Sequence, residues 1–313
     1  MAHSNAKITA LAGGIGAAKL LLGFSRAMPP ENLTIIVNTG DDAELHGLTI
    51  CPDLDTVTYT LAGVVNIAAG WGVTGDTFAA LEWLGRYGRP TWFNLGDRDL
   101  ATHIHRSALL GSGHSLSAAT DSICRALGGR SRILPMSDQP VRTVLETDVG
   151  RLAFQEYFVR EKARPRVQAI HFESAATARP APGVTEAIAS ATAVVICPSN
   201  PLISIGPILA VPGIREALRN RRDTVCAVSP VVAGKSLKGP TDKMLAELGL
   251  EVSALGVARL YADFAGQFIV DESDSDLERF IEELGMRVTS APTVMHTDAD
   301  KQRLAEAILA GIP

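Results

Sequence analysis

Two apolar runs, joined by a glycine turn and a helical segment, open the chain and restrict its fold more than any other feature. Residues 7–12 (KITALA) and 33–37 (LTIIV) are short, continuous apolar runs of the kind found in buried parallel strands. Residues 17–26 between them have the composition of a helix, which a Pro-Pro pair ends. Because parallel strands need a crossover of this kind, residues 7–37 predict a β-α-β unit.

The same pattern returns in the second half of the chain. Residues 193–197 (AVVIC) and 224–228 (TVCAV) are again continuous apolar runs, which is typical of strands covered on both faces. The 313 residues suffice for one large α/β domain or one and a half ordinary ones. We therefore predict an α/β fold with a Rossmann-like, mostly parallel sheet and helices on both of its faces.

The middle of the chain departs from this pattern. Residues 141–147 and 151–159 alternate apolar and polar side chains around an Asp-Val-Gly turn, which predicts an antiparallel β-hairpin. Helical segments flank it. We expect an α/β core over residues 1–130 and 184–313, and an antiparallel insertion or lid subdomain over residues 131–183.

The stretch that follows the second apolar run is the strongest candidate for a functional site. Residues 38–56 (NTGDDAELHGLTICPDLDT) carry four aspartates, Asp41, Asp42, Asp53 and Asp55. Ligands bind at the carboxyl edge of open α/β sheets, and carboxylates there suit Mg²⁺ bridged to a phosphate. A turn or a helix cap explains a single aspartate equally well, and Asp53 or Asp55 can cap the next helix. Four of them facing a glycine-rich loop favour a ligand site.

That glycine-rich loop follows the first apolar run and contains Gly13, Gly14 and Gly16, with Lys19 shortly after. The spacing is neither a complete dinucleotide fingerprint nor a P-loop. A glycine turn at a helix N-terminus nevertheless exposes backbone N–H groups to an anion, and Lys19 can reach the same phosphate. Glycines that only form a turn explain the pattern equally well.

Further polar residues follow later apolar runs. Ser199, Asn200 and Ser204 place donors and acceptors at the edge where the acidic stretch lies. Arg98, between two aspartates, suits either a structural ion pair or a fork that binds phosphate or carboxylate. Residues 92–95 are predicted to form a short strand that precedes Arg98. His103 and His105 are two residues apart on a predicted helix and share no face, so they do not form a metal site together.

Composition excludes several classes of function. A net charge of −5 does not indicate the basic surface that nucleic-acid binding needs. No apolar run approaches the length of a membrane span. The four cysteines are far apart, without metal-binding or redox spacing, and the N-terminus has no signal-peptide pattern. We expect a cytoplasmic protein.

Seven motifs, in their order and spacing, resemble the 2-phospho-L-lactate transferase family of coenzyme F420 biosynthesis over nearly the whole chain. They are GGIGAAKL (13–20), NTGDD (38–42), CPDLDT (51–56), LGDRDLATH (95–103), PMSD (135–138), PSNPLISIGP (198–207) and SPVVAG (229–234).

The resemblance implies a transfer from a guanosine diphosphate ester of lactate, enolpyruvate or glycerate to the deazaflavin alcohol Fo, with Mg²⁺ bound and GMP released. For this chemistry we expect Asp41, Asp53 and Asp55 to be the catalytic residues: Asp41 and Asp55 bind the metal, and Asp53 either accepts the proton or holds a metal-bound water. Related proteins suggest a homodimer. Asp55 and Asn94 match positions associated with Fo in the family, and we add Arg98 to this set. For the donor we expect Gly13, Gly14, Gly16, Lys19, Ser199, Asn200 and Ser204.

Two other functions are weighed against the transferase. A non-enzymatic nucleotide-sugar-binding regulator shares the fold and its glycine and Pro-Ser-Asn-Pro loops. The PDLDT and LGDRD motifs and the aromatic hairpin favour the transferase over it. A nicotinamide-dependent dehydrogenase is disfavoured by the incomplete glycine fingerprint.

Overall fold

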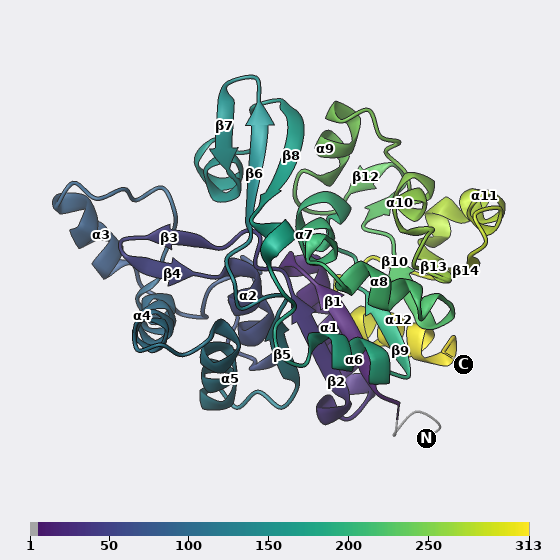
Figure 1. Ribbon diagram of the computed structural model, residues 1–313, viewed down its shortest axis with the longest axis horizontal. Coiled ribbons are helices and arrows are strands. Elements are labelled where there is room, and N and C mark those ends of the chain that lie inside the picture. Colours follow the sequence, from purple (N-terminus) through teal and green to yellow (C-terminus); the bar gives the residue numbers. More distant parts are fainter. Residues whose placement is uncertain (1–5, 313) are drawn as a thin grey trace.

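The computed structural model describes residues 6–312 and is organised around a seven-stranded parallel sheet (Figure 1). The strand order is β14-β13-β10-β9-β1-β2-β5, and all neighbouring strands are parallel. The strands are β1 (Ile8–Ala12), β2 (Leu33–Val37), β5 (Arg132–Pro135), β9 (Ala193–Ile196), β10 (Val225–Val228), β13 (Gln267–Val270) and β14 (Arg287–Ser290). The predicted α/β class and parallel sheet are confirmed.

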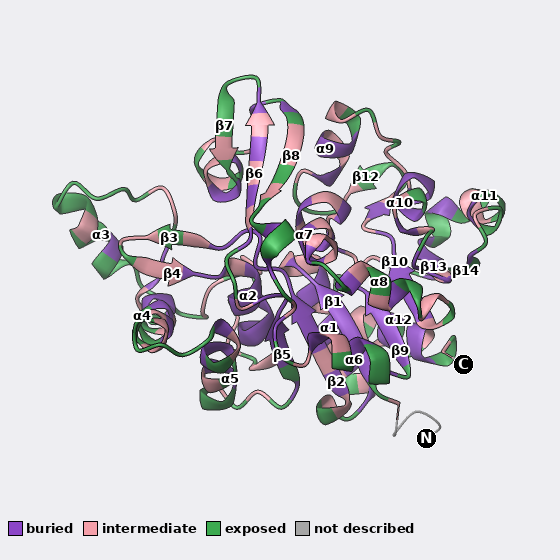
Figure 2. Ribbon diagram, viewed as in Figure 1, coloured by how far each residue is buried: buried purple, intermediate pink, exposed green. Residues whose placement is uncertain are grey.

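Helices cover both faces of this sheet because successive strand residues point to opposite sides. In β1, Leu11 belongs to the core cluster that contains α6, α8 and α10, whereas Ala10 and Ala12 belong to the cluster that contains α1 and α12. The central strands β1, β9 and β10 are accordingly buried along their whole length, whereas the edge strand β14 is partly exposed (Figure 2). The helices are α1 (Gly14–Ala27), α2 (Pro52–Leu61), α3 (Ala79–Arg86), α4 (Asp97–Gly111), α5 (Leu116–Ala126), α6 (Val184–Ser190), α7 (Gly206–Ala210), α8 (Ile214–Arg219), α9 (Thr241–Glu247), α10 (Ala254–Tyr261), α11 (Glu278–Glu282) and α12 (Asp298–Ala310).

The order of the strands reverses between β1 and β9. From β1 the chain adds β2 and β5 on one side, and from β9 it adds β10, β13 and β14 on the other. In open α/β sheets, the crevice beyond the carboxyl ends of the strands at such a switch point is where ligands bind. The topology therefore places the loops after β1 and β9 at the expected ligand position.

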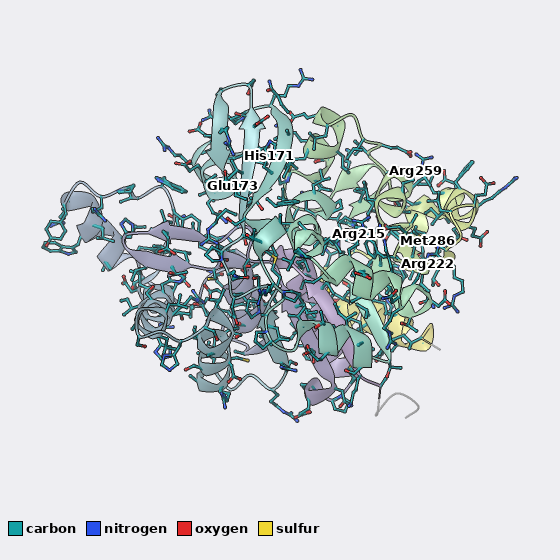
Figure 3. The ribbon with its side chains drawn as sticks, in the orientation of Figure 1. His171, Glu173, Arg215, Arg222, Arg259 and Met286 are labelled. Atoms are coloured by element: carbon teal, nitrogen blue, oxygen red, sulfur yellow. The ribbon has the colours of Figure 1, made fainter. Side chains whose placement is uncertain are left out.

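An antiparallel three-stranded sheet forms the insertion and stands apart from the main sheet in Figure 1. It contains β6 (Arg142–Thr147), β7 (Gly150–Ala153) and β8 (Val167–Glu173), in the order β7-β6-β8. Between the strands, His171 Nε2 lies 3.1 Å from Glu146 Oε1, and an ion pair joins Glu173 to Arg151 at 2.7 Å. His171 and Glu173 are labelled on β8 in Figure 3.

Two details of the insertion differ from the sequence prediction. The strand expected over residues 151–159 ends at Ala153, and the π-helical turn η2 (Glu156–Arg160) follows. Phe154 and Tyr157 are both buried in one apolar cluster, and helical geometry, unlike a strand, brings residues three apart to the same side. The segment 131–183 also begins with β5, the edge strand of the main sheet.

Residues 92–95 form no strand, contrary to the prediction, because the segment is held by reciprocal capping of α3 and α4. The Asp76 carboxylate accepts hydrogen bonds from the backbone N–H groups of Arg98 (2.8 Å) and Asp99 (3.2 Å), at the start of α4. The Asp97 carboxylate accepts one from Ala80 N–H (2.9 Å), at the start of α3. A Cβ atom at Gly96 would lie 2.0 Å from Asp76 Oδ2, so the Gly-Asp-Arg-Asp sequence serves this packing.

Two short hairpins complete the fold. One pairs β3 (Ala43–Leu45) with β4 (Leu48–Ile50), and the other pairs β11 (Val231–Val232) with β12 (Lys235–Ser236). Within residues 6–312, no helix combines the length and apolarity needed to cross a bilayer. All four cysteines are buried and unpaired.

Close packing of α1 against α12 yields a prediction about Gly23. A Cβ atom there would lie 2.1 Å from the Lys301 carbonyl oxygen, so Gly23→Ala is expected to lower the free energy of unfolding by about 1–3 kcal/mol. Gly111→Ala is the matched control, because it is also helical but meets no atom within 4 Å, and it is expected to be neutral or stabilising by up to about 1 kcal/mol. Urea denaturation measures both, and equal effects would contradict the packing argument.

Candidate active site

A cavity of about 500 Å³ opens at the carboxyl ends of the parallel strands. The loops after β1, β2, β9, β10 and β14 all contribute to its lining, together with α2, α4 and the insertion. The candidate residues that line it are Gly13, Gly14, Gly16, Lys19, Asp41, Asp53, Asp55, Asn94, Ser199, Asn200 and Ser204. The structure therefore brings together residues that are up to 191 positions apart, from Gly13 to Ser204.

The loops after β1 and β9 are joined directly at the switch point. The Ser199 hydroxyl accepts a hydrogen bond from Gly13 N–H (3.3 Å) and donates one to the Gly13 carbonyl (2.9 Å). A Cβ atom at Gly16 would lie 2.4 Å from the Pro198 carbonyl oxygen, so glycine permits this close approach. Asn200 caps the π-helical turn η4 (Pro201–Ile205), with its side-chain oxygen 2.8 Å from Leu202 N.

Asn38 connects two of the buried carboxylates. Its side-chain amide donates hydrogen bonds to Asp41 Oδ1 (3.2 Å) and Asp53 Oδ2 (2.9 Å). Asp53 also accepts a hydrogen bond from Gly14 N–H, at the start of α1. Gln155 of the insertion donates from Nε2 to the Asp41 carbonyl (3.0 Å) and to Asp41 Oδ2 (3.3 Å). These hydrogen bonds attach the insertion to the acidic wall of the cavity, by which we mean the side chains of Asp41 and Asp53.

Burial makes ionisation of these carboxylates unfavourable. It is the main cause that raises the pKa of Asp41 well above its ordinary value, and the charges of Asp53 and Asp42 raise it further. Burial likewise raises the pKa of Asp53 to about 6, against the hydrogen bonds from Asn38 and Gly14. It raises the pKa of Asp42 to about 8. A cation bound here would favour the charged forms.

Asp55 has a different environment, because it pairs with the buried guanidinium of Arg106. Arg106 Nη2 bonds to Asp55 Oδ1, and Nη1 lies 3.1 Å from Oδ2. Both side chains are almost fully buried, with 1% of Arg106 and 7% of Asp55 exposed. The pair joins α4 to the first turn of α2. Cys51, not Asp53 or Asp55, is the N-cap of α2, so the predicted capping role of these aspartates is wrong.

Asp99, His103 and Arg106 form a polar face of α4 that sequence reasoning missed. His103 Nε2 lies 3.3 Å from Asp99 Oδ1, its Nδ1 lies 3.6 Å from Asp55 Oδ2, and Tyr59 donates a hydrogen bond to Asp99 (2.7 Å). Among the residues described, Asp55, Asp99 and His103 form a buried group that can hold a metal ion. The sequence feature that could have revealed this group is the four-residue spacing of Asp99 and His103, which places both side chains on one face of a helix.

The remaining walls are largely aromatic. Phe154 and Phe158 of the insertion stack with ring centroids 5.5 Å apart and an interplanar angle of 10°, and both line the cavity. Trp71, Phe93 and Tyr59 line it from the α2–α4 side. A planar aromatic ligand would find stacking partners on two sides.

Three candidates lie outside this arrangement. Arg98 is exposed, does not line the cavity, and donates a hydrogen bond to the Thr74 carbonyl at 2.7 Å. Asp42 accepts a hydrogen bond from the Cys51 thiol (3.1 Å), behind the acidic wall. His105 contacts Ser122 on the exposed side of α4.

Fold and site together define a class of protein: a parallel α/β protein with an acidic, glycine-flanked cavity at the switch point of its sheet. The family model described as 2-phospho-L-lactate transferase CofD matches residues 8–308. The chain belongs to this transferase family.

Individual relatives agree with this assignment. The chain is 48% identical over 300 residues to a phosphoenolpyruvate transferase of Streptomyces griseus, with 94% of each chain covered. It is 43% identical over 305 residues to the 2-phospho-L-lactate transferase of Methanothermobacter thermautotrophicus, covering 97% of this chain and 98% of that one. A crystal structure of a Bacillus halodurans protein shares the fold, with a TM-score of 0.64, 18% identity, and coverage of 97% and 99%.

The buried ion pair gives a prediction about stability. Arg106→Met removes the counter-ion of Asp55 and is expected to lower the free energy of unfolding by about 3–5 kcal/mol, because an uncompensated charge stays buried. Arg125→Met breaks an exposed ion pair with Asp121 and is expected to cost at most about 1 kcal/mol. Chemical denaturation compares the two variants, and a loss below 1 kcal/mol for Arg106→Met would contradict this role.

The raised pKa of Asp53 gives a prediction about pH. Because its folded-state pKa of about 6 exceeds the ordinary value of 3.8, ionisation destabilises the ligand-free fold as the pH rises from 4 to 6. Asp53→Asn is therefore expected to match the wild type at pH 4 and to be more stable at pH 8, by about 3 kcal/mol. Glu216→Gln, at an exposed carboxylate, is the control and should change little at either pH. Thermal unfolding of both proteins without metal measures this difference in stability at the two pH values. An effect of Asp53→Asn that is the same at pH 4 and pH 8 would contradict the raised pKa.

Proposed function

We propose that this protein transfers a phosphorylated three-carbon acid from its guanosine diphosphate ester to the deazaflavin alcohol Fo in coenzyme F420 biosynthesis, releasing GMP. The observation that carries the proposal is the convergence of Asp41, Asp53 and Asp55 with the glycine loop in one cavity. Relatives named as phosphoenolpyruvate and 2-phospho-L-lactate transferases support a donor of this class.

The acceptor fits the aromatic side of the cavity. The tricyclic ring of Fo can stack against Trp71, Phe93 or the Phe154–Phe158 pair. Asp55 and Asn94 line the same side and offer polar groups to the ribityl hydroxyls. The Asn94 amide can both donate and accept hydrogen bonds to a hydroxyl.

The donor fits the side where β1 and β9 meet. Gly13, Gly14 and Gly16 present backbone close to the cavity, and Lys19 supplies a positive charge there. Ser199 and Asn200 use their side chains to hold the loop, and Ser204 lines the cavity beside Gly13. These residues form the site that we assign to the guanosine diphosphate ester.

Mg²⁺ is the proposed metal, with Asp41 and Asp55 as its ligands. The oxygen-only pair suits Mg²⁺ better than a set that includes the imidazole of His103. A carboxylate has about four lone-pair sites, so the contact of Asp55 with Arg106 leaves room for a second partner. Bound Mg²⁺ neutralises charge on the diphosphate and lowers the pKa of a hydroxyl group near it.

The chain's own residues then position the reactants and move one proton. The terminal ribityl hydroxyl oxygen of Fo forms a bond to the phosphorus that bears the acid, while the bond from this phosphorus to the GMP oxygen breaks. Asp53 accepts the hydroxyl proton, and its burial, which raises the pKa of this carboxyl, makes it a stronger base than an exposed aspartate. Charge neutralisation and positioning provide most of the acceleration in such transfers.

The insertion contributes Phe154, Gln155 and Phe158 to the cavity, which supports treating residues 131–183 as a subdomain of the site. Its strands proper begin at Arg142, after β5. The homodimer and the cytoplasmic location that the sequence indicates stay predictions.

An activity assay tests the proposal. With Fo, Mg²⁺ and a guanosine diphosphate ester, the wild type is expected to release GMP and to form a more acidic deazaflavin, and a chelator should stop the reaction. Asp41→Asn should lower kcat by about 100-fold or more, because it removes a charge from the metal site. Glu216→Gln, at an exposed residue far along the chain, should keep wild-type activity.

Parallel reactions with lactyl, enolpyruvyl and glyceryl donors identify the acid by their kcat/KM values. Binding of a uridine diphosphate sugar, with no GMP formed from any of these donors, would reject the transferase in favour of a nucleotide-sugar-binding regulator.

A further inference from the structure

Two lysines with no carboxylate partner line the same cavity. Lys19, on α1, donates a hydrogen bond from Nζ to the Met295 carbonyl at 2.8 Å, and it forms no ion pair with any residue from 6 to 312. Lys238 lies in the turn between β12 and α9, is exposed, and has neither a hydrogen bond nor an ion pair within the described chain. Several other exposed cations of this protein pair with acids, as Arg125 does with Asp121 and Arg151 with Glu173.

The turn that carries Lys238 is fixed on both sides. The Ser236 hydroxyl lies 3.0 Å from the Gly239 carbonyl oxygen and 2.8 Å from Asp242 Oδ1. Gly239 has a φ of +74°, a left-handed conformation that favours glycine, and Pro240 follows. Ala233 N–H, at the tip of the β11–β12 hairpin, is held by Asp274 (3.0 Å). Lys238 is thus presented to the cavity from a defined turn.

No local acid neutralises Lys238. Asp242, the nearest carboxylate along the chain, also accepts a hydrogen bond from Lys243 N–H (2.9 Å). The pKa of Lys19 is lowered mainly by burial, and the positive charges of Lys238 and Lys301 lower it further. Bringing two ammonium groups together is unfavourable until an anion lies between or beside them.

The cavity therefore carries groups of both charges. The carboxylates of Asp41, Asp53 and Asp55 line it together with the ammonium-bearing side chains Lys19 and Lys238. With a net charge of −5, the chain supplies no general positive field, so an anionic ligand depends on such local cations. A diphosphate is the group in the proposed substrates that carries enough negative charge to use both lysines.

We propose that Lys238 is a further donor-binding residue, which acts with Lys19 to neutralise the diphosphate of the guanosine nucleotide. This inference rests on the proposed function for the identity of the nucleotide, and on the two lysines for the anion. An ammonium group acts as a point charge with three donors, so it can follow the phosphate as the bond to phosphorus breaks. The leaving GMP carries the negative charge that Lys238 would stabilise.

Lys238→Met tests the assignment, with Lys235→Met as the matched control. Lys235 lies three residues away on the same hairpin, is exposed, and does not line the cavity. Calorimetry with GDP and with inorganic pyrophosphate, each with Mg²⁺, is expected to show about ten- to a hundredfold weaker binding for Lys238→Met. Lys235→Met should bind both probes like the wild type, and Lys238→Arg should retain most of the affinity.

Two outcomes would overturn the inference. One is unchanged pyrophosphate and GDP affinity in Lys238→Met. The other is an equal loss in both variants, which would indicate a diffuse field and not a specific contact. In steady-state assays, the KM for the donor should rise in Lys238→Met while the KM for Fo stays unchanged, and an equal rise in both KM values would also contradict a donor contact.

The test separates this inference from the proposed function. If the wild type forms no GMP from Fo and the donor, but Lys238→Met still loses pyrophosphate affinity relative to Lys235→Met, the transferase proposal fails and the anion site stands. If the wild type turns over and Lys238→Met keeps full affinity and an unchanged donor KM, the transferase stands and the role of Lys238 is rejected.

Discussion

The burial of several carboxylates at one edge of the sheet is the constraint on which the rest of the structure depends. Each charged carboxylate loses hydration when buried and needs a hydrogen bond, a counter-ion or a proton in return. The protein uses all three: Asn38 donates to Asp41 and Asp53, Arg106 pairs with Asp55, and the pKa of Asp41 and Asp53 is raised. Buried carboxylates with raised pKa values would gain stability from a bound cation, which supports the metal site that we propose.

The fold directs these groups to one place through its topology. Parallel strands end at the same edge, and the reversal between β1 and β9 opens a crevice there. Ser199 joins the two loops across this crevice, and the small size of Gly13 and Gly16 allows Asp53, Ser204 and the Pro198 carbonyl to approach closely. Gly13 and Gly16 thus serve packing in addition to the anion binding that we propose, and larger residues there would displace Asp53 or the Pro198 carbonyl.

The chemistry that we propose follows from the three kinds of side chain that line the cavity. The aromatic lining residues suit a planar acceptor, the carboxylates suit a metal ion, and Lys19 and Lys238 suit a diphosphate. A phosphoryl-type transfer needs its attacking and leaving oxygens held on opposite sides of the phosphorus, with charge neutralised around it. The insertion completes the enclosure, because Gln155 bonds to Asp41 and Phe158 faces the cavity.

The sequence by itself determined the α/β class, the parallel strands, the glycine and acidic loops, and the family, because these depend on apolar runs and on short motifs that are local in the chain. Only the tertiary structure decided how the side chains pair. Asp55 and Arg106 are 51 residues apart, and nothing local indicates that they meet. Arg98 is turned away toward Thr74 while its neighbour Asp99 faces the cavity, since capping by Asp76 sets the direction in which α4 begins. Local patterns indicate most of the elements, whereas long-range packing decides where some of them end, as at Ala153, and which polar groups share one buried space.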